Sequence, residues 1–428
     1  VSEFSQATYR FGSHSFDKKV FRVRPSNAIT FGEGSADPVD YWQPQLSELI
    51  TGEPDEIAAG FRNHLTKAVE RRIEHTERIV CHLSGGLDSS SIAASAHLLT
   101  TEGLDPNRIV TVSAVFPGLD ADESDLIART VAIQRFEHHD FEPRMGPIDW
   151  YAEDMAVTGS PVAHPVRDLT VRTREIANEV GAGLVLTGNG GDEVTADTRV
   201  LSTMLRSGEF GAWFSTIGDL GTDAPGTAVN AAVISAGQAL PSWTKAPLRW
   251  LQRPASRASA PLTARSKTDR TPRELLADSI VNGLHSSRMT FLLETQEAMF
   301  AAAGVEVSHP YLDRDLVEYV AAIAPASRPL SPANKTLTRV AYAELIPKAV
   351  LTVRRTVLGT SLVAKTYKGQ GAQFTDRYPQ VPPDAERFVD PAEYLELLET
   401  STDDLSAVAE LWNRWSLLLW LDTVRSSK

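Results

Sequence analysis

A Gly/Ser-rich stretch between two apolar segments has the residue types of an anion-binding loop. It follows the apolar residues 79–83, precedes a helix-like run over residues 91–99, and reads Ser84-Gly85-Gly86-Leu87-Asp88-Ser89-Ser90. A strand, a glycine turn and a helix N-terminus bring backbone N–H groups and hydroxyls to a point where the helix dipole favours negative charge. The glycines let the backbone approach a phosphate closely, and Asp88 can hold a cation against it. The sequence therefore predicts a pyrophosphate-binding loop.

This loop differs from the Walker phosphate loop, whose pattern Gly-x-x-x-x-Gly-Lys-Ser/Thr is absent here. It is similar to the signature of ATP pyrophosphatases, which cleave ATP between its α and β phosphates and leave AMP on the substrate. Taken alone, the motif is also compatible with a glycine turn that only caps a helix. Further motifs are needed to decide between the two interpretations.

A second loop of the same kind follows the apolar residues 184–186. It reads Thr187-Gly188-Asn189-Gly190-Gly191-Asp192-Glu193. Because loops at the carboxyl ends of neighbouring parallel strands face one crevice, we expect Asp192 to meet Asp88 across a bound magnesium-triphosphate. Two carboxylates from separate loops suit a hard cation that also binds phosphate oxygens. The predicted metal ligands are therefore Asp88 and Asp192.

A third element, residues 308–319, is a proline turn that opens an amphipathic helix. In this order and at these separations, the three stretches resemble the synthetase domain of the asparagine synthetase family, over roughly residues 16–425. Residues 112–116 and the following Asp122-Glu123-Ser124 are similar to the family's second strand and the loop after it. The resemblance implies that ATP is bound by Leu83, Ser84, Gly85, Gly86, Asp88, Ser89, Ser90, Val112, Ser113, Gly188, Asn189 and Gly190.

The hydrophobic pattern predicts the fold class. Residues 79–191 alternate between strand-like and helix-like runs, which is typical of an α/β fold with a doubly wound parallel sheet. Apolar residues spaced by three or four predict a helix over about residues 44–70, and the part after residue 191 is predicted to be mostly helical. Residues 252–273 are rich in Ser, Ala, Pro, Arg and Lys and lack periodicity, which predicts a mobile loop.

The resemblance also divides the chain. Residues 1–45 resemble the tail of the family's amino-terminal glutaminase-like domain, most of which is missing from this chain, and residues 46–428 correspond to the synthetase domain. The family's glutaminase uses an N-terminal cysteine as its nucleophile. The sole cysteine here, Cys81, lies inside the predicted strand before the phosphate loop, where a small buried apolar residue is the expected role. We therefore expect no release of ammonia from glutamine by this chain.

Composition excludes several other classes. With 42 basic and 55 acidic residues, the net charge of −13 disfavours nucleic-acid binding through a general basic surface. One cysteine excludes an intramolecular disulfide framework. No apolar run approaches the about 18 residues of a membrane span, and no signal-peptide pattern opens the chain. We expect a cytoplasmic protein that binds neither nucleic acid nor membrane.

The last third of the chain bears on the substrate. Lys335 begins an amphipathic run and resembles the family lysine that contacts the phosphates, although a solvent-facing helix lysine is the alternative. The stretches after it resemble the lasso peptide cyclases, family members that close a macrolactam ring within a ribosomally made peptide. These stretches are residues 346–351, 354–356, 359, 367–369, 388–391 and 411–421.

Leu358 is a departure from the cyclase pattern. The cyclases and β-lactam synthetase place a lysine there, where it can stabilise the oxyanion of acyl transfer, a contribution of about 3 kcal/mol that leucine cannot supply. We predict that a neighbouring basic residue replaces it, with Arg354 and Arg355 the first candidates and Lys365 and Lys368 the others. The predicted catalytic residues are therefore Lys335, Arg354 and Arg355.

Asn189 is the second departure. Asparagine synthetases carry a glutamate at this place and β-lactam synthetase a catalytic tyrosine, whereas an asparagine can bind but cannot act as a general base. Base catalysis is therefore unassigned.

The resemblance implies a reaction in two steps. A substrate carboxylate attacks the α-phosphorus of ATP, with Mg²⁺ on Asp88 and Asp192, and an amine then attacks the acyl adenylate to give an amide and AMP. The implied partners are a peptide or small-molecule carboxylate and an amine, with a leader peptidase and a leader-peptide-binding protein if the substrate is a lasso precursor. An amidotransferase that uses ammonia or a small amine, a small-molecule lactam synthetase, and a non-catalytic ATP- or peptide-binding scaffold stay open.

Overall fold

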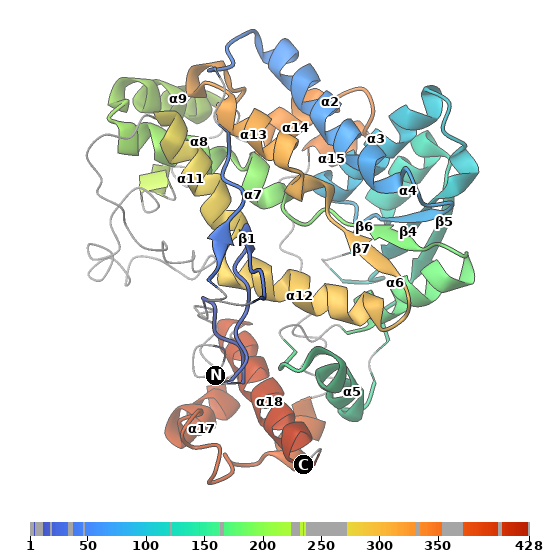
Figure 1. Ribbon diagram of the computed structural model, residues 1–428, viewed down its shortest axis with the longest axis vertical. Helices are drawn as coiled ribbons and strands as arrows, with labels where there is room; N and C mark the ends of the chain where they lie inside the picture. Colours follow the sequence, from blue (N-terminus) through green and yellow to red (C-terminus); the bar gives the residue numbers. More distant parts are fainter. Residues whose placement is uncertain are drawn as a thin grey trace.

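The computed structural model describes residues 4, 12–17, 19–32, 37–45, 48–119, 122–144, 146–162, 167–223, 232–233, 235–236, 272–330, 334–352, 371–400 and 405–426. Within these residues, five parallel strands form one sheet in the order β5-β4-β3-β6-β7. The strands are β3 (Ile79–His82), β4 (Ile109–Ala114), β5 (Glu137–Phe141), β6 (Leu184–Leu186) and β7 (Glu306–Ser308). The predicted doubly wound parallel sheet is therefore confirmed (Figure 1).

The strand order places the functional loops. From β3 the chain builds outward through β4 and β5, and then returns to add β6 and β7 on the other side of β3. The direction of winding thus reverses between β3 and β6, the point where open α/β sheets bind ligands at the carboxyl ends of their strands. The Gly/Ser loop follows β3 and the second glycine loop follows β6, so both lie at this reversal.

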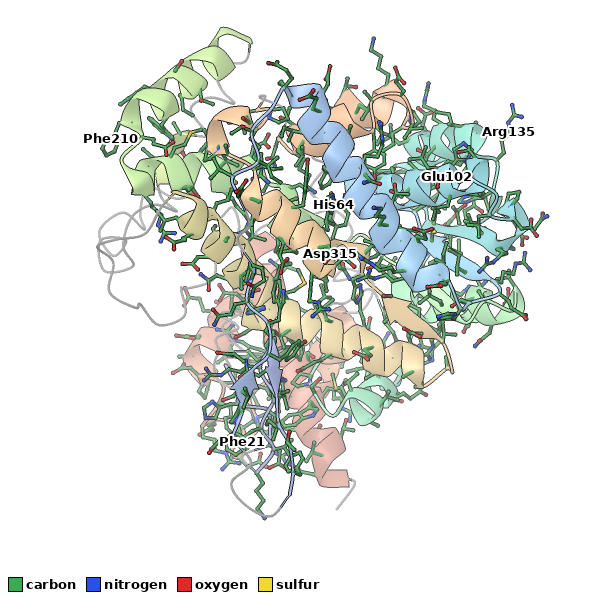
Figure 2. All side chains as sticks on the ribbon, turned by 45° about the horizontal axis from the view of Figure 1, so that its top comes forward. Phe21, His64, Glu102, Arg135, Phe210 and Asp315 are labelled. Atoms are coloured by element: carbon green, nitrogen blue, oxygen red, sulfur yellow. The ribbon has the colours of Figure 1, made fainter. Side chains whose placement is uncertain are left out.

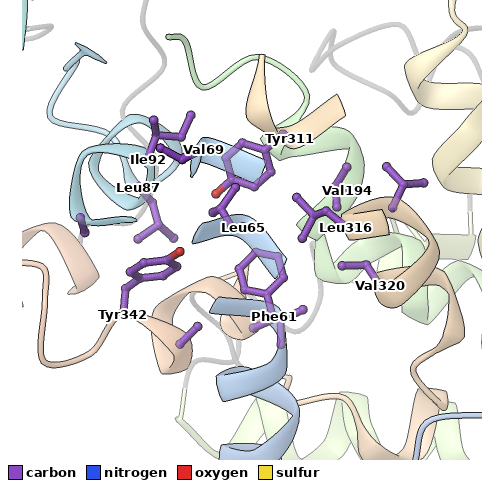
Figure 3. Packing of buried hydrophobic residues seen from close by; sticks show 14 of the residues in the cluster. Phe61, Leu65, Val69, Leu87, Ile92, Val194, Tyr311, Leu316, Val320 and Tyr342 are labelled. Carbon is purple, nitrogen blue, oxygen red and sulfur yellow. The ribbon is translucent and has the colours of Figure 1, made fainter. Parts of the chain in front are cut away.

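Helices cover both faces of the sheet because the side chains of each strand alternate in direction. Ile79 and Cys81 belong to a core shared with α2 (Pro54–Ile73) and α3 (Leu87–Thr101), whereas Val80 packs with Ile176 of α6 (Asp168–Glu179). The first core extends to α4 (Ser124–Gln134), α8 (Asp197–Ser207), α11 (Pro272–Leu284), α13 (Arg314–Ala322) and α14 (Thr336–Ala341). Figure 3 shows Phe61, Leu65 and Val69 of α2 gathered near Tyr311 and Tyr342 in this core.

A separate core is built by the last helices. It joins α5 (Asp149–Thr158), α17 (Pro391–Thr400) and α18 (Leu405–Ser426), with Trp415 stacked on Phe374 at a centroid distance of 5.0 Å. α12 (Ser287–Ala301) contributes Phe291 to this core and Phe300 to the core beneath the sheet. In Figure 1, α12 crosses between the sheet and the lower helices α5, α17 and α18. This helix therefore ties the two parts together.

The remaining elements are short or lie at the edge of these cores. They are β1 (Asn27–Ala28), β2 (Val39–Asp40), the 3₁₀ turns η1 (Pro106–Arg108), η3 (Pro310–Leu312) and η4 (Pro325–Ser327), and the helices α7 (Gly191–Thr195), α9 (Phe210–Asp223) and α15 (Lys348–Thr352). β1 and β2 pair antiparallel, and the segment around them contacts the α11–α12 region through Ser26 with His285 and Arg22 with Glu294. Phe21 of this segment and Phe210 of α9 are exposed in separate places (Figure 2). The assignment of residues 1–45 to the tail of a glutaminase-like domain stays a prediction.

Two details of the sequence-based fold were wrong. The predicted helix over residues 44–70 begins only at Pro54, because proline suits the first helical position and residues 48–53 are not helical. β7 was missed because it has three residues, none of them fully buried. The predicted mobile loop over about residues 252–273 stays a prediction, because residues 252–271 lie outside the described residues and α11 begins at Pro272.

Candidate active site

The Gly/Ser loop forms a tight turn between β3 and α3. Gly85 adopts a φ of +75°, and Gly86 is the N-cap of a helix that begins at Leu87, earlier than the predicted run. A Cβ on Gly85 would lie 2.8 Å from the Cβ of Glu123, so glycine is needed for both conformation and space. Asp88 and Ser89 therefore sit in the first turn of α3, where free backbone N–H groups favour an anion.

Hydrogen bonds within the loop hold this turn in one shape. Ser89 Oγ accepts the backbone N–H of Ser84 at 3.0 Å and donates to the carbonyl of Gly86 at 3.1 Å. The hydroxyls of Ser84 and Ser89 also lie 3.0 Å apart. The loop is thus organised by its own side chains, in agreement with a preformed anion site.

Hydrogen bonds from the neighbouring strand β4 hold the residue that precedes the loop. Leu83 donates its N–H to the carbonyl of Val112 at 2.8 Å, and the buried hydroxyl of Ser113 donates to the carbonyl of Leu83 at 2.6 Å. Val112 and Ser113 therefore position the end of β3 in the structure. Their direct contact with ATP stays a prediction.

The second glycine loop packs against the first. A Cβ on Gly191 would lie 2.3 Å from Cγ of Asp88, and a Cβ on Gly188 would lie 3.0 Å from the backbone nitrogen of Ser89. Gly190 has a φ of +94°, which a residue with a side chain rarely adopts. Glycines therefore bring the loop after β6 onto the helix that carries Asp88, and the expected meeting of the two loops is confirmed.

Lys335 joins the two predicted metal ligands. Its Nζ lies 2.5 Å from Oδ2 of Asp88 and 2.8 Å from Oδ1 of Asp192. The side chains of Asp88 and Lys335 are largely buried, whereas that of Asp192 is 60% exposed. Burial raises the pKa of Asp88, and Lys335 opposes that rise. Burial acts to lower the pKa of Lys335, but the two aspartates outweigh it and the pKa is raised. The sequence-based alternative of a solvent-facing helix lysine is therefore wrong.

A strained backbone presents Lys335 to the aspartates. Asn334 and Lys335 have φ angles of 59° and 54°, in the left-handed region that non-glycine residues seldom occupy. Asn334 Oδ1 accepts the N–H of Asp197 at 2.9 Å, and the hydroxyl of Thr336 donates to Asp197 Oδ2 at 2.7 Å. Arg339 Nε also donates to the carbonyl of Asn334 at 2.7 Å. The conformation is thus fixed by bonds on both sides of the lysine.

Asp197 was not predicted to belong to the site. It is the first residue of α8 and is buried, and this burial raises its pKa to about 6. No motif surrounds it in the sequence, so its contact with Thr336 could be found only in the structure. It bonds to both neighbours of Lys335 and so helps to position that lysine.

The third motif, residues 308–319, is bonded to the helices beside the phosphate loop. The hydroxyl of the fully buried Tyr311 lies 2.7 Å from Ser91 Oγ of α3. Asp313 accepts hydrogen bonds from Arg71 and Arg72 of α2, and Arg71 also contacts Asp315, which is labelled in Figure 2. These bonds tie the turn and α13 to the helices that flank the phosphate loop.

The residue Asn189 is held between the sheet and α12. Its backbone N–H donates to Thr187 Oγ1 at 3.3 Å, and Thr187 Oγ1 lies 2.7 Å from His309 Nδ1. Burial, with a smaller contribution from Arg72, lowers the pKa of His309 to about 4, so this imidazole is neutral at pH 7. The side-chain amide of Asn189 donates to Gln296 Oε1 at 2.7 Å. Gln296 was missed because nothing in the sequence pairs it with the loop.

The residues at this point fit a magnesium ion that is shared with phosphates. Asp88 Oδ1 is buried and makes no hydrogen bond to any described residue, which leaves an oxygen of the right type uncommitted. Across the described ranges, no group of three or more His, Cys, Asp or Glu side chains is placed to hold a metal. Two carboxylates are nevertheless sufficient, because Mg²⁺ usually takes one or two of them and completes its shell with phosphate oxygens and water.

The predicted acyl-transfer residues lie outside the described part of the chain. These are Arg354, Arg355 and the alternatives Lys365 and Lys368, together with Leu358. Their roles therefore stay predictions. Among the described residues, no helix combines the length and the apolarity that crossing a membrane requires.

Comparison with known proteins agrees with this geometry. Residues 60–424 match the family described as asparagine synthase. The chain belongs to the asparagine synthase family. Enzymes of this family are ATP-dependent carbon–nitrogen ligases, and the family predicted from the sequence motifs is confirmed.

Individual relatives match in part. The protein is 26% identical to amidase chry2 of Gibberella zeae, over 45% of this chain and 31% of that protein. It is 35% identical to asparagine synthetase [glutamine-hydrolyzing] 3 of Bacillus subtilis over 18% of this chain and 13% of that protein. It is 42% identical to carboxyethyl-arginine beta-lactam-synthase of Streptomyces clavuligerus over 16% of this chain and 13% of that protein. The matched segments thus span about a third or less of the length of each of these three proteins.

Proposed function

We propose that this chain forms an amide bond by first joining a substrate carboxylate to AMP, with ATP as the co-substrate and pyrophosphate as the other product. The observation that carries the proposal is the meeting of Asp88, Asp192 and Lys335 beside a Gly/Ser loop at the reversal point of the sheet. A non-catalytic scaffold would have no need for a lysine in a strained backbone between two carboxylates.

In the first step, the chain binds and orients the triphosphate. The N–H groups and hydroxyls of Ser84 to Ser90 receive the pyrophosphate portion, and Lys335 supplies a positive charge next to it. Asp88 and Asp192 would hold Mg²⁺, which when bound neutralises phosphate charge and favours in-line attack by the carboxylate. Positioning and charge neutralisation therefore account for most of the catalysis.

In the second step, an amine of the substrate attacks the activated carboxyl group. We propose macrolactam closure of a ribosomally made, lasso-type peptide, so that an Asp or Glu side chain and the peptide's amino terminus supply the two reacting groups. A leader peptidase and a leader-peptide-binding protein would then act with this enzyme. The similarity of residues 388–391 and 411–421 to lasso cyclases supports this substrate, and in the structure these residues build the second core.

Cys81 is not a candidate nucleophile of this site. It is buried in β3, and burial raises the pKa of its thiol to about 12. A thiol that stays protonated at pH 7 is a poor nucleophile. The expectation that this cysteine has a structural role is in agreement with its position.

Arg354 and Arg355 remain our candidates for stabilising the acyl-transfer oxyanion in place of the lysine that Leu358 displaces. We expect Arg354→Ala or Arg355→Ala to slow amide formation while ATP–pyrophosphate exchange continues. Parent-like amide formation in both variants would contradict this assignment.

The substrate is tested with a panel of peptides that each carry a free amino terminus and one Asp or Glu side chain. With Mg²⁺ and ATP, mass spectrometry should show a product lighter by one water that no longer reacts with amine reagents. The variant Asp88→Asn should give none. If small carboxylates rather than peptides are converted, a small-molecule synthetase is the correct assignment, as the beta-lactam-synthase relative would suggest.

A further inference from the structure

A pair of carboxamides stands beside the site and is not used by the two-step reaction. Asn189 Nδ2 donates to Gln296 Oε1 at 2.7 Å. This bond uses one of the two N–H groups on Asn189 Nδ2 and one lone pair of Gln296 Oε1. Among the described residues, Asn189 Oδ1 and Gln296 Nε2 have no hydrogen-bond partner, and both residues are partly exposed. Each amide therefore keeps one end that no described residue contacts, the carbonyl oxygen of Asn189 and the NH₂ group of Gln296.

The pair is held rigidly. Asn189 lies between Gly188, which packs closely against Asp88, and Gly190, which packs closely against Tyr311 and Leu312. Its loop therefore has little room to move. Gln296 lies on α12, whose Phe291 and Phe300 are anchored in two different cores. The two amides are thus fixed from opposite sides, which lets them select a ligand by geometry.

The chemistry of the pair limits what it can bind. A carboxylate presents only acceptors and an ammonium group only donors, so neither satisfies both free ends. A residue of an extended peptide presents its own N–H and C=O on the same edge, as in a β-ladder. An uncharged pair with one acceptor and one donor matches that edge.

We propose that Asn189 and Gln296 bind the backbone of a peptide substrate, with Asn189 Oδ1 accepting an N–H and Gln296 Nε2 donating to a C=O. This inference rests on the proposed function, because it names the peptide backbone next to the reacting carboxylate as the group that is recognised. Asn189 is thereby a binding residue and Gln296 also positions it.

The test uses matched probes. The first is N-acetyl-L-aspartic acid N-methylamide, and the second replaces its aspartyl N–H with an ester oxygen; the glutamyl pair is used in the same way. Equilibrium binding by calorimetry in the presence of Mg²⁺ and a non-hydrolysable ATP analogue measures recognition, and ATP–pyrophosphate exchange measures adenylation. We expect the parent to bind the amide probe about ten-fold more tightly than the ester, as one hydrogen bond permits.

Variants separate this role from a structural one. Gln296→Leu removes the bond that orients Asn189 and the donor to the peptide C=O. It should therefore abolish the preference for the amide probe over the ester probe. Asn189→Leu removes the acceptor for the aspartyl N–H and should also abolish it. Gln296→Glu keeps the acceptor for Asn189 but loses the donor to the peptide C=O. It should bind both probes more weakly and still prefer the amide probe over the ester probe. Glu297→Leu, at an exposed neighbouring position on α12, is the control and should behave as the parent.

The outcomes distinguish the two proposals. If a preference that depends on Asn189 and Gln296 is seen without pyrophosphate exchange, the recognition holds and the proposed function fails. If amide and ester probes are adenylated and bound equally by the parent, the function holds and this inference is overturned. Absence of binding by every probe, or a preference that survives Gln296→Leu and Asn189→Leu, also overturns it.

Discussion

Lys335 sets the charge balance at the carboxyl end of the sheet. Its ammonium group contacts both Asp88 and Asp192, so that two carboxylates share one positive charge. When a cation that arrives with triphosphate binds these carboxylates, Lys335 can turn toward phosphate oxygens.

Replacement of this lysine is the first prediction at the residue scale. Lys335→Met keeps the length of the side chain and removes its charge, so we expect ATP–pyrophosphate exchange to fall by about 100-fold or more. Lys348→Met changes an exposed lysine and serves as the control. A rate near that of the parent in Lys335→Met would show that the lysine does not stabilise the phosphates.

Asp197 gives a prediction for pH. Burial raises its pKa from the ordinary 3.8 to about 6 in the folded state. The folded state thus binds this proton more tightly than the unfolded state does, so the stability from this group is present below about pH 4 and is lost as the pH rises through about 6. In urea titrations, the unfolding free energy of the parent relative to Asp197→Asn should fall by about 3 kcal/mol between about pH 4 and about pH 7.

The matched control for that experiment is Asp376→Asn, at an exposed position. Its unfolding free energy relative to the parent should show little change over the same range. If the Asp197→Asn difference is equally flat, Asp197 titrates at its ordinary pKa and is not buried in the way the structure shows.

Sequence reasoning at the residue scale succeeded where a motif existed. Asp88, Asp192 and Lys335 were expected at one site, and the structure brings them together. Asp197 and Gln296 were not expected, because their contacts with Thr336 and Asn189 span 139 and 107 residues of sequence. Such contacts depend on how helices pack across the fold, which the local pattern of residues does not contain.

At the scale of elements, the site depends on glycines that let two loops touch. The loop after β6 reaches Asp88 only because Gly191 has no side chain, since a Cβ there would lie 2.3 Å from Cγ of Asp88. The strands β3, β4 and β6 were predictable because they are short, buried apolar runs bounded by turn residues. The start of α2 was not, since apolar residues at helical spacing continue ahead of Pro54 without forming a helix.

Substitution of Gly191 is the prediction at this scale. Gly191→Ala should push the second loop away from Asp88 and lower both the melting temperature and ATP–pyrophosphate exchange. Gly211→Ala is the control, because a Cβ on this helical glycine of α9 meets no atom within 4 Å and alanine favours helix by about 1 kcal/mol. Unchanged exchange in Gly191→Ala would mean that contact between the loops is not needed for adenylation.

At the scale of the whole molecule, the described residues form two large, separate hydrophobic cores. One core surrounds the sheet and holds the phosphate loop, and the other is built by α5, α17 and α18. α12 contributes to the second core and to the face of the sheet opposite the first, and it carries Gln296 to the loop of Asn189. The sheet and its loops were predictable from sequence, whereas this relation between cores was not.

The central claim is that ATP is split between its α and β phosphates to activate a carboxylate. The most direct measurement incubates the protein with Mg²⁺, the peptide panel, hydroxylamine as a general acceptor, and ATP labelled at the α-phosphorus. The account predicts labelled AMP as the main product, together with pyrophosphate and a hydroxamate of the peptide, and none of these with Asp88→Asn or Asp192→Asn. Labelled ADP as the main product, or full AMP formation in either variant, would contradict it.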